Sequence, residues 1–262
     1  MYNVINSDPD NDASFTLLLK LTFNENVPMK KLLAALLLTL PTISVAIDLE
    51  GYYITAKGGI SKTLDTGIMT YITVDDTNPL NNEDLGTGSA FGFSAGKYIT
   101  DNLRLELEVI KRASYELDTS LEANNTTIIE GDIDSNSIFI NGFYDFQPFF
   151  MSNTAITPYL GGGVGISRNK MGTLTETTAG GNIVTLDSNT INQFAYKVSA
   201  GTFVSLTDNL SLDINYQYVN LGSIKSGVNI NGGGIADTLV KPLNEGEIKT
   251  QELMVGLQYT FK

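Results

Sequence analysis

The chain has 262 residues, of which 42% are hydrophobic and 9% aromatic, and its formal net charge is -13 at pH 7. It contains no cysteine and no histidine, which excludes disulfides, zinc sites built from thiolates or imidazoles, cysteine nucleophiles and Ser-His-Asp catalysis. The acidity argues against a nucleic-acid partner, because phosphate binding relies on clustered lysine and arginine.

The beginning of the chain carries two different patterns. Residues 1–28 are polar, and we expect them to be a disordered extension that results from an upstream start, with Met29 as the actual first residue. A basic pair at 30–31, an apolar core at 32–40 and a small-x-small sequence at 44–46 then follow in the order of a secretory signal. Residues 29–46 are therefore predicted to be a signal peptide cleaved after Ala46, and residues 47–262 the mature protein. A short buried helix is the alternative.

From residue 51 onward, eight segments alternate apolar with polar or small residues, which is the period of a β-strand. They span residues 51–61, 90–99, 103–115, 136–146, 156–167, 191–206, 210–221 and 246–262. Long connections at 62–89, 116–135, 168–190 and 222–245 alternate with shorter ones at 100–102, 147–155 and 207–209. No run reaches the roughly 18 apolar residues of a membrane-spanning helix, so a chain that crosses a membrane must use strands. The pattern predicts an all-β, eight-stranded, antiparallel, up-and-down transmembrane β-barrel.

The third segment shows best what the inside of such a barrel would contain. Its leucines alternate with arginine and glutamate, a face that a soluble core would not accept. We expect the charged residues of the inward faces to form an ion-pair network in the lumen. Its members are Lys57, Arg104, Glu106, Glu108, Arg112, Asp145, Lys197, Asp213 and Glu252. Glu106 and Glu108 could also suggest an acid and base pair, but the opposed charges around them favour the structural interpretation.

Glycines mark the fifth segment. Gly161, Gly163 and Gly165 alternate with larger residues, and we expect them to face inward and make room for facing side chains. The run resembles a phosphate loop only superficially, because no lysine follows and no helix is predicted. We therefore predict no cofactor.

One of the long connections contains a β-prone run. Met69, Tyr71, Ile72 and Val74 lie within an otherwise polar stretch, which suggests a ribbon that extends the barrel wall. Such a ribbon would offer backbone edges and aromatic contacts to a partner. Alternatively, the run packs on neighbouring loops.

Several sequences together resemble the superfamily of opacity proteins and OmpA-type eight-stranded outer-membrane barrels, especially its surface-antigen branch in rickettsia-like bacteria. They are NGFYDF at 141–146, TPYLGGGVG at 157–165, QFAY at 193–196, DNLSLD at 208–213 and YQY at 216–218. The resemblance implies a place in the cell outer membrane and contact with its lipid. It also implies that the barrel-assembly machinery reads the closing row Leu257, Tyr259 and Phe261, although Lys262 follows the aromatic residue that normally ends the family's chains.

The resemblance and the four long connections together predict a structural surface protein that adheres to a host-cell receptor through extracellular loops. We expect no enzymatic activity. Two alternatives remain open at this point. A small pore for ions or small solutes would use the polar inward faces, and a soluble lipocalin-like ligand binder would also have eight strands but would place its apolar faces inward.

Overall fold

The computed structural model describes residues 49–262, apart from short gaps at 65–68, 74–75, 80–84, 122–123, 178–179, 233–234 and 239–243. The chain divides into two compact units, Met1–Leu49 and Glu50–Lys262. The first unit lies almost wholly outside the described residues. The predicted extension at 1–28 and the predicted signal peptide at 29–46 both fall there.

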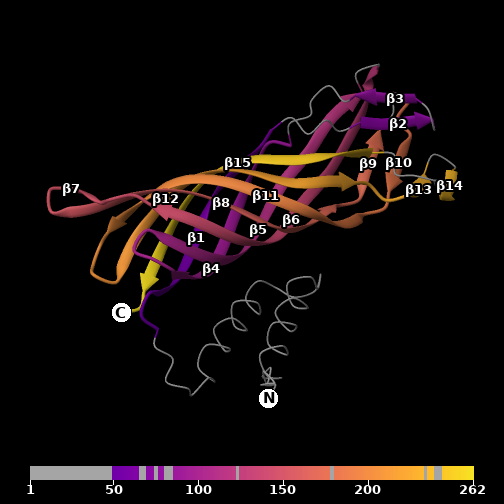
Figure 1. Ribbon diagram of the computed structural model, residues 1–262. Coiled ribbons are helices and arrows are strands. Elements are labelled where there is room, and N and C mark those ends of the chain that lie inside the picture. Colours follow the sequence, from indigo (N-terminus) through magenta and orange to yellow (C-terminus); the bar gives the residue numbers. More distant parts are fainter. Residues whose placement is uncertain are drawn as a thin grey trace, which may run out of the picture. The chain divides into compact units, whose positions relative to one another are not determined.

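Eight long strands form a closed antiparallel barrel (Figure 1). They are β1 Tyr52–Thr63, β4 Thr87–Tyr98, β5 Leu103–Leu121, β6 Asn124–Asp145, β8 Thr154–Met171, β11 Asn189–Ser205, β12 Leu210–Lys225 and β15 Asn244–Thr260. Each pairs with the next of these strands along the chain, and β15 pairs with β1 to close the ring. The predicted fold class and the order of the eight segments are therefore confirmed.

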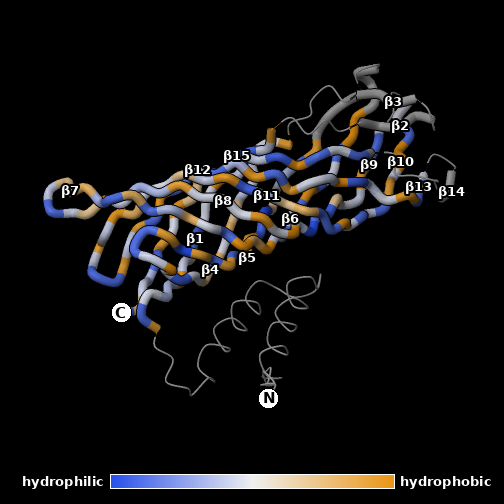
Figure 2. Tube along the Cα trace, in the orientation of Figure 1, coloured by the Kyte–Doolittle hydropathy of each residue, from blue (hydrophilic) through white to orange (hydrophobic). Residues whose placement is uncertain are grey.

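Hydrophobic and hydrophilic residues alternate along the strands of the wall, as predicted (Figure 2). On β5, Leu103 and Leu105 are exposed on the outer surface, whereas Arg104 and Glu106 between them are buried inside the barrel. The apolar row of β15, which ends at Tyr259, is exposed in the same way. An apolar exterior over a polar interior suits a wall surrounded by lipid. It is the reverse of what a soluble lipocalin-like binder requires.

The two tight turns are built alike. In the turn after β4, the Leu103 amide donates to the Thr100 hydroxyl at 3.0 Å, and the Asn102 side chain donates to the Asp145 carbonyl at 2.8 Å. The turn after β11 repeats both contacts, from Leu210 to Thr207 at 3.0 Å and from Asn209 to Thr260 at 2.8 Å. The asparagine thus ties each turn to the end of the neighbouring strand. We call this side of the barrel the short-turn end.

Seven further strands are short. They are β2 Met69–Thr73, β3 Asp76–Pro79, β7 Phe149–Met151, β9 Leu174–Thr177, β10 Ile183–Leu186, β13 Asn229–Gly232 and β14 Ile235–Thr238. All except β7 lie at the opposite side, the long-loop end (Figure 1). There β9, β10, β13 and β14 pair in that order beside β6, and β2 pairs with β3 and with the start of β15.

The prediction that residues 116–135 form a long connection between two strands is wrong. β5 and β6 continue through most of this stretch as one long hairpin. Leu117, Ile129 and Ile133 are fully buried in this stretch, as is Tyr115 just before it, and the burial of these apolar side chains stabilises the hairpin although acidic residues lie between them. Much of the predicted loop material is therefore regular sheet.

The inward glycines of β8 face large side chains of β6. Gly161 pairs with Phe143, Gly163 with Asn141 and Gly165 with Phe139. A Cβ added to Gly161 would lie 2.2 Å from the Phe143 ring, and one added to Gly163 would lie 2.0 Å from Asn141 Oδ1. The prediction that these glycines make room for facing side chains is confirmed.

Candidate functional site

The inside of the barrel holds the charged residues that the sequence singles out, and Arg104 is the centre of the layer nearest the short-turn end. Its Nε donates to Asp145 Oδ1 at 3.0 Å, and its Nη1 donates to the Tyr53 hydroxyl at 3.2 Å. Glu106 Oε2 lies 3.7 Å from the same Nη1. Because the guanidinium is buried, these acceptors offset the cost of removing its charge from water.

Aromatic rings surround the same guanidinium. Its Cζ lies 4.0 Å from the centre of the Phe143 ring, 4.7 Å from Tyr159 and 4.8 Å from Phe203, which are distances typical of cation–π contacts. Tyr159 stacks on Phe203 and donates its hydroxyl to Asp213 Oδ1 at 2.6 Å. The sequence prediction did not include these rings. The sequence could have indicated them, because all three rings occupy inward positions of the alternating pattern.

Glu108 is the centre of the middle layer. Its carboxylate lies between two ammonium groups, Lys57 at 2.5 Å and Lys197 in direct contact. Asn141 donates to both Glu106 and Glu108 at 3.2 Å. Lys57 is also 3.8 Å from Glu106, so the two glutamates share this lysine, whereas Lys197 pairs with Glu108. The four charges therefore balance within a space from which water is largely removed.

Glu252 is the centre of the third layer, toward the long-loop end. Arg112 binds its carboxylate with two nitrogens, at 2.5 Å through Nε and 3.2 Å through Nη2. Gln217, Ser61 and Thr250 donate to the same carboxylate at 2.5, 2.8 and 2.8 Å. Every one of these side chains is buried, so the carboxylate has exchanged its water shell for five protein donors.

All nine predicted lumen residues are thus buried inside the barrel, four of them basic and five acidic. They come from six of the eight barrel strands, β1, β5, β6, β11, β12 and β15. Asp213 differs from the other acids because its hydrogen bond comes from a tyrosine.

Within the described part of the chain, no helix is long and apolar enough to cross a membrane.

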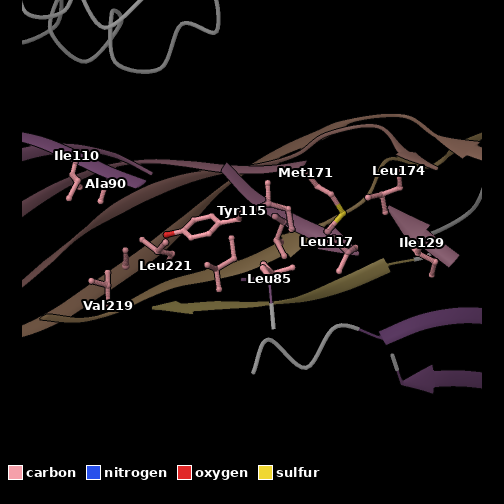
Figure 3. Close-up of a cluster of buried hydrophobic side chains, with 14 of the residues drawn as sticks. Leu85, Ala90, Ile110, Tyr115, Leu117, Ile129, Met171, Leu174, Val219 and Leu221 are labelled. Carbon is pink, nitrogen blue, oxygen red and sulfur yellow. The ribbon is translucent and has the colours of Figure 1, made fainter. Parts of the chain in front are cut away.

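Most of a hydrophobic core lies beyond the third layer, at the long-loop end, and the rest of it extends between the charged layers as far as Ile110 (Figure 3). Its side chains come from barrel strands and from the short strands beside them. They include Leu85, Tyr115, Leu117, Ile129, Ile133, Met171, Leu174, Leu186, Leu221, Ile224 and Ile248. Tyr115 joins the two regions, because its hydroxyl lies 2.5 Å from Ser61 Oγ, which itself binds Glu252. The sequence prediction did not include this core.

Two further predicted groups have separate places. Met69, Tyr71 and Ile72 lie in β2 at the long-loop end, where the structure describes their backbone, and Val74 lies outside the described residues. Leu257 and Tyr259 are on the outer face of β15, and Phe261 packs edge-on against Tyr259 with ring centres 5.2 Å apart. The closing row thus ends in an aromatic pair at the short-turn end.

Comparisons with known proteins agree with this architecture. Residues 32–261 match the family described as outer membrane protein beta-barrel domain. Outer membrane protein PagN of Salmonella typhimurium is 28% identical over 228 residues, which cover 81% of this chain and 90% of PagN. RC1281 of Rickettsia conorii, named as a candidate adhesin, is 27% identical over 187 residues, 70% of this chain and 71% of that protein.

Among solved structures, Neisserial surface protein A is 19% identical, with 81% of this chain and 98% of that chain covered and a TM-score of 0.49. The match to the family, over residues 32–261, spans all eight barrel strands. The chain therefore belongs to the outer membrane protein beta-barrel domain family and is a β-barrel protein of the cell outer membrane.

Proposed function

We propose that this protein is a surface adhesin that binds a host-cell receptor through its long-loop end. The observation that carries the proposal is that this end is a folded platform, defined here as the continuations of β5 and β6 together with β2, β3, β9, β10, β13 and β14. The platform rests on the hydrophobic core of Figure 3. A binding surface of defined shape needs such rigid support. Loops that serve only to connect strands have no need of a packed core beneath them.

The platform offers two strand edges. In the described part of the sheet, β14 is its last strand on one side, and β3 pairs with β2. Exposed edges accept an added strand from a partner through backbone hydrogen bonds. Residues Met69, Tyr71, Ile72 and Val74 remain the predicted contact, because three of them form the strand beside one of these edges. The similarity to RC1281, a protein named as a candidate adhesin, supports the same proposed function.

We also propose that the lumen is closed. Eight strands leave an interior just wide enough for side chains, and here three layers of buried ion pairs fill it, with a hydrophobic core above them. The pore alternative would require a continuous water path through these layers. Glu106 and Glu108 are held between lysines and an asparagine, which supports a structural role for both and no catalytic step.

The adhesin proposal is tested by displaying the full chain on a non-adherent Gram-negative strain and counting the bacteria bound to cultured host cells. The test variant carries Tyr71→Ser and Ile72→Ser, and the control carries Thr207→Ser at the short-turn end. We expect the test variant to lose most of the binding and the control to keep it. Equal binding by both variants, with heat-modifiable electrophoresis showing both folded, would contradict the assignment to β2.

The pore alternative has its own test. Purified protein refolded into planar bilayers should give no stable single-channel currents. Large, long-lived currents from the unmodified protein would overturn the closed lumen and leave the adhesin proposal untouched.

A further inference from the structure

The third connection at the short-turn end differs from the two tight turns. After β6 ends at Asp145, the chain forms β7, turns at Ser152 and Asn153, and returns as the start of β8. β7 pairs with β8 from Phe149 opposite Ile156 to Met151 opposite Thr154. This hairpin projects beyond the end of the barrel wall (Figure 1).

Its side chains are unusually apolar for a connection. Phe149 is 49% exposed, Phe150 72% and Met151 62%. No charged residue occurs between Asp145 and Arg168, whereas the two tight turns each carry an aspartate, Asp101 and Asp208. The polar residues of the connection are Gln147 before β7, Ser152 and Asn153 at the tip, and Thr154 at the start of β8. Figure 2 shows a hydrophilic tip on an otherwise more apolar hairpin.

The register shows that one face of the hairpin continues the outer surface of the barrel. Val204 on β11 pairs with Ile156, and Ile156 pairs with Phe149. Side chains of directly opposed residues point to the same face of a sheet. Val204 belongs to the row of β11 that exposes Phe194, Tyr196 and Val198 to lipid, so Phe149 and Met151 continue the lipid-facing surface.

We propose that this hairpin lies in the interfacial region of the bilayer leaflet at the short-turn end and anchors the barrel there by contact with lipid. Aromatic and apolar side chains favour this zone, where their rings meet the headgroup level. The neighbouring aromatic pairs, Tyr144 with Phe146 and Tyr259 with Phe261, mark the same level on the barrel.

The backbone sets the depth. In the described residues β7 pairs on one side with β8, so its outer edge carries backbone groups that need hydrogen bonds. Such an edge does not occur within the hydrocarbon region, because unsatisfied backbone groups cost several kcal/mol there. The hairpin therefore lies at the headgroup boundary, where water reaches its backbone, while the ring of Phe149 and the thioether side chain of Met151 reach the acyl chains.

The absence of tryptophan from the chain allows a direct test. Single variants Phe149→Trp and Met151→Trp place one reporter on the hairpin, and Thr207→Trp places a matched reporter on a tight turn. All three positions are on the surface, and heat-modifiable electrophoresis checks that each variant is folded. The proteins are refolded into phosphatidylcholine vesicles whose lipids carry bromine near the headgroup or near the chain end.

We expect the tryptophans on the hairpin to emit at shorter wavelength than the tryptophan on the tight turn. Their emission should fall strongly with bromine near the headgroup and less with bromine near the chain end, and acrylamide in the water should quench it only weakly. Water-like emission with acrylamide quenching equal to that of Thr207→Trp would overturn the proposal, because the hairpin would then lie free in water. Emission protected from both quenchers, or dependent on the protein-to-lipid ratio, would also overturn it, since the hairpin would then contact a second copy.

Discussion

Arg112 and Glu252 form a two-pronged ion pair inside the barrel, with Nε 2.5 Å from Oε1 and Nη2 3.2 Å from Oε2. Both side chains are wholly buried, with 0% exposure. The pair joins β5 to β15, two strands that do not pair directly in the wall. It therefore links, through the lumen, two wall strands that are separated by β4 and β1.

Removal of Glu252 from this pair should be more harmful than removal of Arg112. Glu252→Met leaves a buried guanidinium and three orphaned donors, and we expect a loss of about 3–5 kcal/mol in the free energy of unfolding. Arg112→Met should cost less, because Gln217, Ser61 and Thr250 still donate to the carboxylate.

The double variant Arg112→Met with Glu252→Met should lose less than the sum of the two single variants. Unfolding by denaturant in lipid vesicles, followed by heat-modifiable electrophoresis, measures all three losses. Strict additivity would show that the two side chains do not interact in the folded protein.

Gly165 and Gly142 form a matched pair of glycines for a packing test. A Cβ at Gly165 would meet the Ile138 carbonyl oxygen at 2.0 Å, whereas one at Gly142 would meet only the end of the Leu105 side chain at 3.8 Å. We expect Gly165→Ala to destabilise the barrel by about 1–3 kcal/mol, the usual cost of overpacking. Gly142→Ala should change its stability by less than about 0.5 kcal/mol, as outer-surface changes do. Unfolding by denaturant in lipid vesicles measures both changes in stability. Equal stability of the two variants would contradict the packing argument.

Leu117 supports the platform and not the membrane barrel. Leu117→Ala should lower the stability of the platform by about 2–5 kcal/mol, as for other buried leucines. We expect protease added to intact cells to cleave the long-loop end of this variant faster than that of the unmodified protein, while the barrel strands in the membrane stay resistant. Leu105→Ala on the lipid face is the control and should leave the cleavage rate unchanged. Global loss of the folded barrel in Leu117→Ala would show that the two parts unfold as one.

Phe261 tests the predicted assembly signal. Phe261→Ala removes the last aromatic ring of the closing row and its contact with Tyr259. We expect less folded protein in the outer membrane of producing cells, but an unchanged yield when purified protein refolds into vesicles without assembly machinery. A similar fall in both yields would indicate that Phe261 stabilises the barrel itself.

The strands inside the membrane could be predicted because each keeps a single alternation of apolar and polar residues. The long-loop end could not, and two bulges explain why. The pairing of β5 with β6 shifts between Arg112 and Tyr115. At this shift the inward positions of β5 change from even to odd residue numbers, whereas those of β6 stay odd. The pairing of β12 with β15 shifts at Gly222, whose φ of 76° suits glycine.

Beyond these bulges the polarity of the two faces is also exchanged. Inside the membrane the polar face is inward, as at Glu108, whereas in the platform the inward residues are apolar, as at Leu117 and Ile129. A period-two pattern read continuously through the bulge at Arg112 loses both its register and its expected polarity. The charged lumen residues could be named because they lie between the bulges and the short-turn end, where the alternation is regular. Their partners across the barrel could not, because each contact depends on the stagger of strands far apart in the chain.

The most direct test of the adhesin proposal measures binding of the purified full chain, embedded in lipid nanodiscs, to cultured host cells. We predict saturable binding to host cells, competed by unlabelled protein and strongly reduced for the Tyr71→Ser and Ile72→Ser variant, while Thr207→Ser binds as the unmodified chain does. Binding of the unmodified protein no greater than that of empty nanodiscs would contradict the adhesin function.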